Sequence, residues 1–358
     1  MTGEKKLRDD ERYILPNSNY VWRIVFTFTI VLGHSGMVDI SHASYYIGVD
    51  YFFIISGFFL AKGSGKNGDT IKYTINRIKK LYPHVILSFM IFFVWCYKSA
   101  DNMLDIIRGL VYHLNQIVPM LYLILPGAEG ETNYLNFSTW YISVLLICGI
   151  LVHYLYTKHR ELTVSVIAPL VVLFGYAYMG KMSFNTGDQV GLFLNCYYVR
   201  GFAGMYMGVL IYEAVMQLRK IPFSRLAYIL FHVIEYISFG LLLWIIRYCG
   251  NNANDIYFVG LISLGILMSF MYETKIDLIM KKMKWLNDLM YPVYLNHLFV
   301  LAWLTSRSWF WDISNVWHKG AIIVMYIVLL IWSVLTNNLL RGIKYINKKY
   351  VRDLLIKE

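Results

Sequence analysis

Long apolar stretches alternate with short polar breaks along this chain of 358 residues. Each stretch has the length of a helix that crosses a bilayer, about 20 residues, and none shows the strict alternation of a membrane β-strand. The pattern predicts an all-α, polytopic membrane bundle of about ten transmembrane helices. We expect them near 21–40, 45–61, 83–98, 138–156, 162–180, 199–216, 226–247, 254–272, 288–305 and 320–340.

The charge pattern predicts the orientation of these helices. The formal net charge is +11, and 25 of the 33 lysines and arginines fall in alternate loops and the two tails. Such a distribution is typical of cytoplasmic loops, so we expect a multi-pass protein of the cytoplasmic membrane with both termini cytoplasmic, and no nucleic-acid partner. The distribution holds only if residues 104–125 do not cross, so we expect a re-entrant or interfacial segment there.

No linker, repeat or low-complexity tract divides the sequence. We expect a cytoplasmic tail over 1–20, one membrane domain over 21–340 and a basic cytoplasmic tail over 341–358, without a cleavable signal peptide. The four cysteines are scattered, which predicts neither a disulfide framework nor a metal site.

Arg23 and His34 both lie within the first apolar stretch. Ionisable side chains inside a bilayer-length helix are costly, so they are more often functional than structural. Eleven residues return to nearly the same helix face, about 16 Å further along the axis. We therefore expect the two residues to line one path, Arg23 at its cytoplasmic mouth and His34 nearer the outer face.

Asp50 opens the second stretch, and a short turn connects it with the end of the first. A carboxylate beside a histidine fixes its tautomer and raises its basicity, so Asp50 is a candidate support for His34. The simpler alternative is a hydrated aspartate at the membrane interface. Gly48 and Gly57 allow close helix packing in either case.

The loop 62–80 is glycine-rich in its first half and basic in its second, where we expect a short helix that ends near Pro83. Arg77 and Lys80 are three residues apart and share one face of this helix. The simple interpretation is a cytoplasmic loop that contacts anionic lipids. The sharper one is a clamp for the phosphates of a multiply phosphorylated cofactor.

The order of these motifs resembles the acyltransferase-3 family of polytopic membrane acyltransferases. Arg-x10-His in the first span is followed by GVDYFFIISGFFL and then by RIKKLYP. Weaker similarities over the rest of 20–340 are FSTWYISVLL, RGFAGMYMGVLIYE and LMYPVYLNHLFV. The first eighty residues carry most of the resemblance.

The resemblance implies transfer of an acyl group, commonly acetyl from acetyl-CoA as co-substrate, to a hydroxyl of a cell-surface or lipid-linked glycan. His34 would be the catalytic histidine, Arg23 the second essential residue of the same helix and Asp50 the support of the histidine. Arg77 and Lys80 would meet the CoA phosphates.

For the acceptor we expect contacts from Trp140, Arg200 and His297, although His297 also fits a hydrogen-bonded core histidine. The chain departs from elaborate family members in having no glutamate shortly after Trp140. We also expect no hydrolase-like domain after the last span, so the membrane core would complete the transfer or pass the acyl group on.

Two other classes of protein compete with this interpretation. A transporter or flippase of a small solute or lipid-linked sugar would favour inverted repeats, whereas the ionisable motifs here crowd the first three spans. A polysaccharide polymerase or ligase would favour large outer loops. Membrane lipids are expected partners, and a second copy of the chain or envelope-biosynthesis proteins are further candidates.

Overall fold

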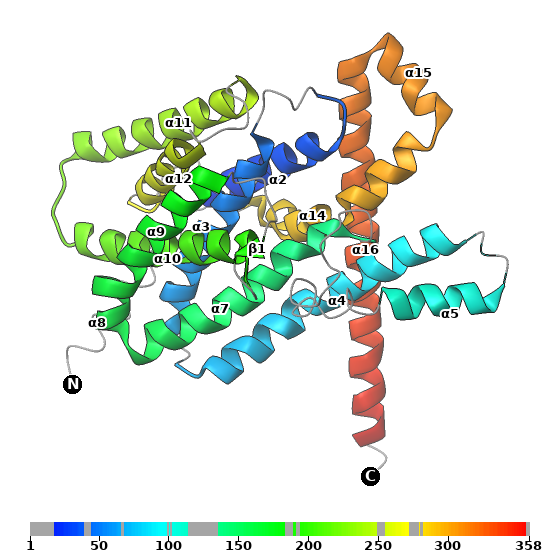
Figure 1. Cartoon of the computed structure of the whole chain (residues 1–358), viewed down its shortest axis with the longest axis horizontal. Helices are drawn as coiled ribbons and strands as arrows, with labels where there is room; N and C mark the ends of the chain where they lie inside the picture. Colours follow the sequence, from blue (N-terminus) through cyan, green and yellow to red (C-terminus); the bar gives the residue numbers. More distant parts are fainter. Residues whose placement is uncertain are drawn as a thin grey trace. The chain divides into compact units, whose positions relative to one another are not determined.

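The computed structural model describes residues 18–38, 44–65, 68–98, 100, 102–113, 135–182, 189–190, 194–248, 255–271, 279 and 282–355. The described chain is helical apart from one antiparallel pair of two-residue strands (Figure 1). It divides into two compact units, each built from two separate parts of the sequence. Unit 1 comprises residues 1–73 and 147–287, and unit 2 comprises 74–146 and 288–358.

Unit 1 begins with α2 (Ser18–His34), η1 (Tyr45–Ile47), α3 (Gly48–Ser64) and the first turn of α4 (Thr70–Tyr97). The second half of α7 (Trp140–Lys158) leads into α8 (Arg160–Leu162), η4 (Thr163–Ile167) and α9 (Ala168–Met182). The unit ends with β1 (Gln189–Val190), β2 (Leu194–Asn195), α10 (Cys196–Leu218), α11 (Arg225–Tyr248) and α12 (Asp255–Ser269).

Unit 2 contains the rest of α4, α5 (Met103–Tyr112), η3 (Phe137–Thr139) and the first half of α7. Its C-terminal part consists of α14 (Lys284–Thr305), α15 (Ser308–Val316) and the 38-residue α16 (His318–Leu355). In Figure 1, α15 folds back beside the start of α16.

The predicted all-α, polytopic architecture is confirmed, because a helix occupies each of the ten expected spans. Seven helical stretches of the described chain are long and apolar enough to cross a bilayer. The others are α2 with 17 residues, α12 with 15 and the more polar α14. Two predicted boundaries are wrong: α2 ends at His34 rather than near residue 40, and α4 continues through Pro83 as one helix of 28 residues.

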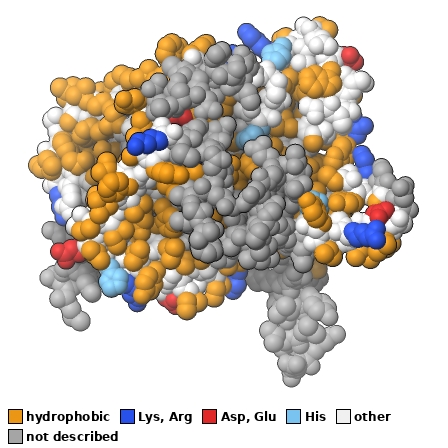
Figure 2. Space-filling view, viewed as in Figure 1, with side chains coloured by type: hydrophobic (Ala, Val, Ile, Leu, Met, Phe, Trp, Pro, Cys, Tyr) orange, Lys and Arg blue, Asp and Glu red, His pale blue; other side chains and the backbone are white. Residues whose placement is uncertain are grey.

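The surface of α11 shows why the unit suits a lipid environment. Its exposed side chains are large and apolar and recur every three or four residues: Leu226, Leu230, Val233, Ile237, Leu241, Trp244 and Tyr248. Its buried face carries Glu235 and Ser238 beside Phe239, Leu242 and Ile246. Glu235 and Ser238 thus lie inside while the outer face is apolar, as a bilayer requires. Figure 2 shows hydrophobic side chains gathered over the part of unit 1 that contains α9 to α11.

Helices α3 and α10 pack in backbone contact and run in the same direction. A Cβ added to Gly57 would overlap the carbonyl oxygen of Met205, and one added to Gly208 would overlap that of Ile54. The prediction that Gly57 permits close helix packing is therefore confirmed. This close approach fixes which residues of the two helices face each other.

One turn between α8 and α9 is a π-helix. The N–H of Ala168 donates to the carbonyl oxygen of Thr163, five residues back. Both residues are buried, and the four between them are exposed or half-buried. The wider turn therefore keeps Thr163 on the buried face of α9.

Part of the predicted re-entrant or interfacial segment, 104–125, is described as α5. This helix has ten residues, about 15 Å, so it does not cross a bilayer by itself. Asn102 caps its start, and apolar side chains such as Met103 and Val111 are exposed. Burial lowers the pKa of His113, which follows the helix, so its imidazole is neutral at pH 7. Residues 114–125 lie outside the described part.

Candidate functional site

His34 ends α2, and its side chain is exposed. Its Nδ1 lies 3.0 Å from the carbonyl oxygen of Ile30, one turn earlier in the same helix. Because a carbonyl can only accept, Nδ1 carries the hydrogen of this bond and Nε2 is the basic nitrogen of the neutral ring. The orientation suits a base that takes a proton through Nε2.

Asp50 has a partner other than the expected one. The Nη2 of Arg200 donates to its Oδ2 at 2.6 Å, and Nε lies 3.1 and 3.2 Å from the two carboxylate oxygens. Both side chains are almost fully buried. The pairing follows from the contact between α3 and α10, which brings Arg200 opposite Asp50, whereas His34 turns toward its own helix.

This ion pair changes two expectations. The carboxylate of Asp50 contacts Arg200 and not His34. The guanidinium of Arg200 is buried and therefore closed to an acceptor. The pair instead joins α3 to α10 through a bidentate, charge-assisted contact. Residues 150 positions apart in sequence gave no sign that they would meet.

Helix α2 packs along only part of the unit. The Nε1 of Trp22 donates to the buried carboxylate of Glu235 at 2.7 Å, and the backbone N–H of Ser44 donates to Ile246 near the end of α11. Glu235 is ten residues from the start of α11, about 15 Å. Arg23, next to Trp22, therefore lies about halfway along the unit, not at its mouth as we expected.

The guanidinium of Arg23 is half-buried, and within the described part of the chain it makes no hydrogen bond or ion pair. A cation held at such a depth without a protein partner is costly.

Glu235 and His232 are ionisable residues of α11 that our sequence analysis overlooked. His232 Nδ1 lies 3.3 Å from Glu235 Oε2. Their signal was present in the sequence, since a histidine and a glutamate three residues apart in an apolar span share one helix face.

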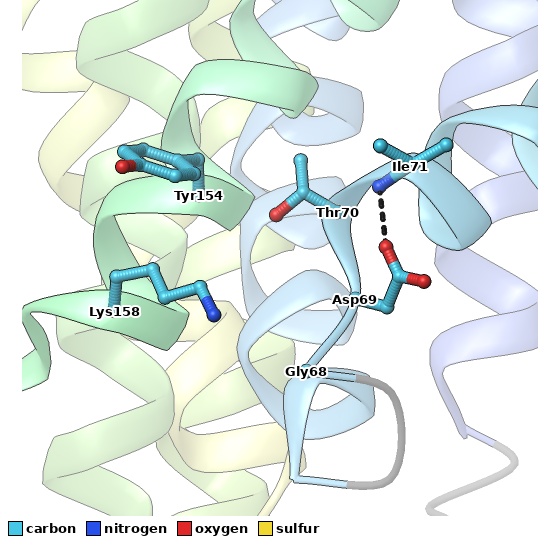
Figure 3. A pocket seen from close by; sticks show the side chains of 6 residues that line it. All are labelled: Gly68, Asp69, Thr70, Ile71, Tyr154 and Lys158. Carbon is cyan, nitrogen blue, oxygen red and sulfur yellow. Dashed lines mark hydrogen bonds between the residues drawn. The ribbon is translucent and has the colours of Figure 1, made fainter.

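An open hollow of about 530 Å³ lies at the other end of unit 1 (Figure 3). Residues 68–71 form one wall, and Tyr154 and Lys158 of α7 form the other. Figure 3 shows the ammonium of Lys158 directed toward the 68–70 segment. Among the described residues it has no hydrogen-bond or ion-pair partner. Four of the six lining residues thus come from the loop predicted to meet phosphates.

His153 fixes the wall of this hollow from behind. Its Nδ1 lies 3.0 Å from the hydroxyl of Thr70, and its ring stacks on Tyr73 at 4.2 Å. The buried histidine thereby holds the first turn of α4 to α7. Sequence analysis did not single it out, because a lone histidine in an apolar helix is usually a core residue.

Arg77 and Lys80 follow Thr70 by seven and ten residues on the same helix, α4. The predicted helix over the second half of the loop is confirmed, so the two residues share a face at i, i+3. Arg77 is half-buried and Lys80 is exposed. They belong to unit 2.

Trp140 and His297 belong to one aromatic cluster of unit 2. Trp140 is in ring contact with Tyr141, which contacts Tyr294, which in turn contacts His297. His297 is fully buried, and its Nδ1 lies 2.5 Å from the carbonyl oxygen of Tyr294. The structure thus brings two of the predicted acceptor-binding residues together.

Asn136 is the polar centre beneath this cluster, and sequence analysis did not select it. Its amide donates to the hydroxyl of Ser88 at 2.7 Å and to the carbonyl oxygen of Leu295 at 2.9 Å. Its carbonyl oxygen accepts from Ser138 at 2.6 Å. The run NFST before an apolar span was the available signal, but caps of this kind are common.

Fold and sites together define a multi-pass membrane protein with an exposed histidine, a half-buried arginine without a described partner and a hollow walled by a glycine-containing loop. A family model described as an acyltransferase domain matches residues 21–337, so the chain belongs to the acyltransferase-3 family and is a membrane acyltransferase. Searches of curated proteins and of solved structures gave no match. Among the described residues, no group of three or more His, Cys, Asp or Glu could hold a metal ion.

Proposed function

We propose that the protein moves an acyl group, commonly acetyl, from acyl-CoA to a hydroxyl of a cell-surface or lipid-linked glycan. The observation that carries this proposal is the spacing of three groups along unit 1. The hollow with Lys158 follows the end of α3, Arg23 lies about halfway, and His34 lies beyond the start of α3. The 17 residues of α3 correspond to about 25 Å.

This spacing suits an elongated donor. CoA carries its phosphates at one end and its thioester at the end of a long, flexible arm. In the proposed arrangement Lys158 binds the phosphates, and Arg23 binds a polar group of the arm. Arg77 and Lys80, which belong to unit 2, are separate candidates for phosphate contacts. The thioester then approaches His34.

His34 performs the proposed chemistry. Its Nε2 takes the proton of the acceptor hydroxyl while the hydroxyl oxygen attacks the thioester carbonyl. The carbon–sulfur bond breaks, the CoA thiolate leaves, and the proton held by His34 returns to the thiolate. Transfer through an acyl-histidine would use the same nitrogen as a nucleophile.

Trp140 and His297 are the candidate contacts for the acceptor within unit 2. The hollow faces the cytoplasm in this proposal, because its wall residue Lys158 belongs to the basic segment 157–161 and the basic segment 217–225 follows α10, which runs in the same direction as α3. Acyl-CoA is cytosolic and surface glycans are completed outside, so the two substrates approach from opposite ends.

The first test uses His34→Ala with His159→Ala as its control, because His159 is an exposed histidine that is not among the residues lining the hollow. Purified wild-type protein is expected to transfer labelled acetyl from acetyl-CoA to an envelope glycan fraction. His34→Ala is expected to lose transfer by at least about 10²-fold while remaining in the membrane, and His159→Ala to retain it. A transporter or a polymerase would give no labelled glycan in either form.

Retention of transfer by His34→Ala would refute the role of His34. Absence of both transfer and acyl-CoA hydrolysis in the wild type, with every acyl donor and envelope fraction tried, would refute the proposed donor.

A further inference from the structure

Residues 44–47 form a short turn between α2 and α3, and two neighbouring helices hold its backbone. The N–H of Ser44 donates to the carbonyl oxygen of Ile246 in α11 at 2.8 Å. The Nη2 of Arg200 in α10 donates to the carbonyl oxygen of Tyr46 at 2.7 Å. The 44–47 turn is therefore anchored at both of its ends.

Asp255 of α12 holds the same turn through side chains. Its Oδ1 accepts from the hydroxyl of Ser44 at 3.3 Å, and its Oδ2 accepts from the hydroxyl of Tyr46. The aspartate is fully buried at the start of an apolar helix. Burying a carboxylate costs desolvation free energy unless hydrogen bonds compensate for the lost water. Both oxygens of Asp255 accept such bonds from the 44–47 turn.

The 44–47 turn packs directly against the end of α2. A Cβ added to Gly33 would overlap the side chain of Tyr45, and one added to Gly48 would meet Ile30 at 3.0 Å. Gly33 immediately precedes His34, and Ile30 supplies the carbonyl that orients the imidazole. A shift of the turn therefore moves the two residues that determine where His34 lies.

We propose that Asp255 is a positioning residue for His34, acting through Ser44 and Tyr46 of the 44–47 turn. The inference rests on the proposed function, because it assigns Asp255 to the chemistry of His34. Asp255 works by accepting two hydrogen bonds, so its charge is dispensable. Asparagine at this position can still accept from Tyr46 and donate to Ser44, whereas alanine can do neither.

Unit 1 offers a matched control with the same chemistry. At the end near the hollow, Glu213 of α10 accepts from the hydroxyl of Tyr156, and Arg160 donates to both its oxygens at 2.9 Å. This group also joins a tyrosine, a half-buried carboxylate and an arginine, but it lies outside the hollow's lining. Tyr156→Phe reproduces the loss of a tyrosine–carboxylate bond without touching the 44–47 turn.

The test compares Asp255→Ala, Asp255→Asn, Tyr46→Phe and Tyr156→Phe in purified protein, with rates normalised to folded protein. Asp255→Ala is expected to lower kcat by about 10²-fold with little change in the KM for acyl-CoA, because a misplaced catalytic group costs rate more than binding. Asp255→Asn is expected to retain most of kcat and the wild-type pH profile. Tyr46→Phe should fall between them, and Tyr156→Phe should keep wild-type kcat.

A second measurement does not depend on turnover. Modification of His34 by diethyl pyrocarbonate, followed by mass spectrometry of its peptide, is expected to change rate several-fold in Asp255→Ala and not in Asp255→Asn, with His159 as the internal reference. An unchanged rate at His34 in Asp255→Ala would overturn the positioning role. An Asp255→Asn variant as inactive as Asp255→Ala would also overturn it. Failure of the proposed function would appear separately, as a wild type without transfer.

Discussion

Asp50 and Arg200 form a buried ion pair whose side chains are closed to a substrate. Each side chain is almost fully enclosed, and removal of either would leave an uncompensated charge, which costs about 3–5 kcal/mol in buried pairs. Arg23, His34 and Lys158 differ from them because they are half-buried or exposed. Arg23, His34 and Lys158 are therefore accessible to a ligand, whereas Asp50 and Arg200 are not.

Lys158 gives a prediction at the scale of one residue. If the hollow receives the phosphates of the donor, Lys158→Ala should raise the KM for acyl-CoA about tenfold. A tenfold loss of affinity corresponds to the free energy of one charge-assisted hydrogen bond. The KM for the acceptor should not change. Lys220→Ala is the control, since Lys220 is an exposed lysine hydrogen-bonded to Gln217 and outside the hollow's lining. Equal effects of the two substitutions on the KM for acyl-CoA would contradict the assignment.

Sequence reasoning at this scale found residues but not their partners. Arg23, His34 and Asp50 stood out because each is costly within an apolar stretch. Their partners depend on how helices pack, and neither Arg200 opposite Asp50 nor Asp255 beside Tyr46 follows from any spacing in the sequence. Glu235 was missed although it obeys the rule that selected Arg23.

At the scale of elements, the contact between α3 and α10 determines which side chains of the two helices can pair. Two glycines, Gly57 and Gly208, bring the backbones together, and this closeness allows Arg200 to reach Asp50. Periodicity predicted the helices themselves well, because each apolar run has the length of a span. It predicted helix ends poorly, because α4 continues through Pro83 as one helix of 28 residues.

Gly57→Ala and Gly208→Ala are expected to destabilise unit 1. The added methyl would meet a backbone carbonyl that cannot turn aside, so the cost should be at least the 1–3 kcal/mol of ordinary overpacking, roughly. Gly63→Ala and Gly240→Ala are the controls, because nothing lies within 4 Å of a Cβ at either position. Thermal unfolding in detergent should show a lower Tm only for the first two. An unchanged Tm in Gly57→Ala would mean that the helices separate without cost.

The direction of the helices in unit 1 has a consequence for the whole molecule. Helix α4 begins beside the hollow and α7 ends beside it, since both line it. If each crosses the membrane once, the chain between Tyr97 and Phe137 begins and ends on the same side. The prediction that 104–125 does not cross, which came from charge alone, requires the same arrangement.

Orientation can be measured with single cysteines in a cysteine-free background. Tyr257 is 70% exposed near the start of α12, at the end of unit 1 with His34, and Lys220 is exposed at the end with the hollow. A membrane-impermeant thiol reagent is expected to label Tyr257→Cys in intact cells and Lys220→Cys only after permeabilisation. The reverse pattern would invert the proposed topology and place the hollow outside.

The single π-turn between α8 and α9 marks a place where the chain carries one residue more than an α-helix needs. Losing one residue from 164–167 would turn it into an ordinary helical turn, and Thr163 and Ala168 would stay on the same face at i, i+4. The same deletion within α10 would rotate every later side chain by about 100° and separate Gly208 from α3. Loss of one residue is therefore expected to be tolerated in the π-turn and not in the part of α10 that precedes Gly208.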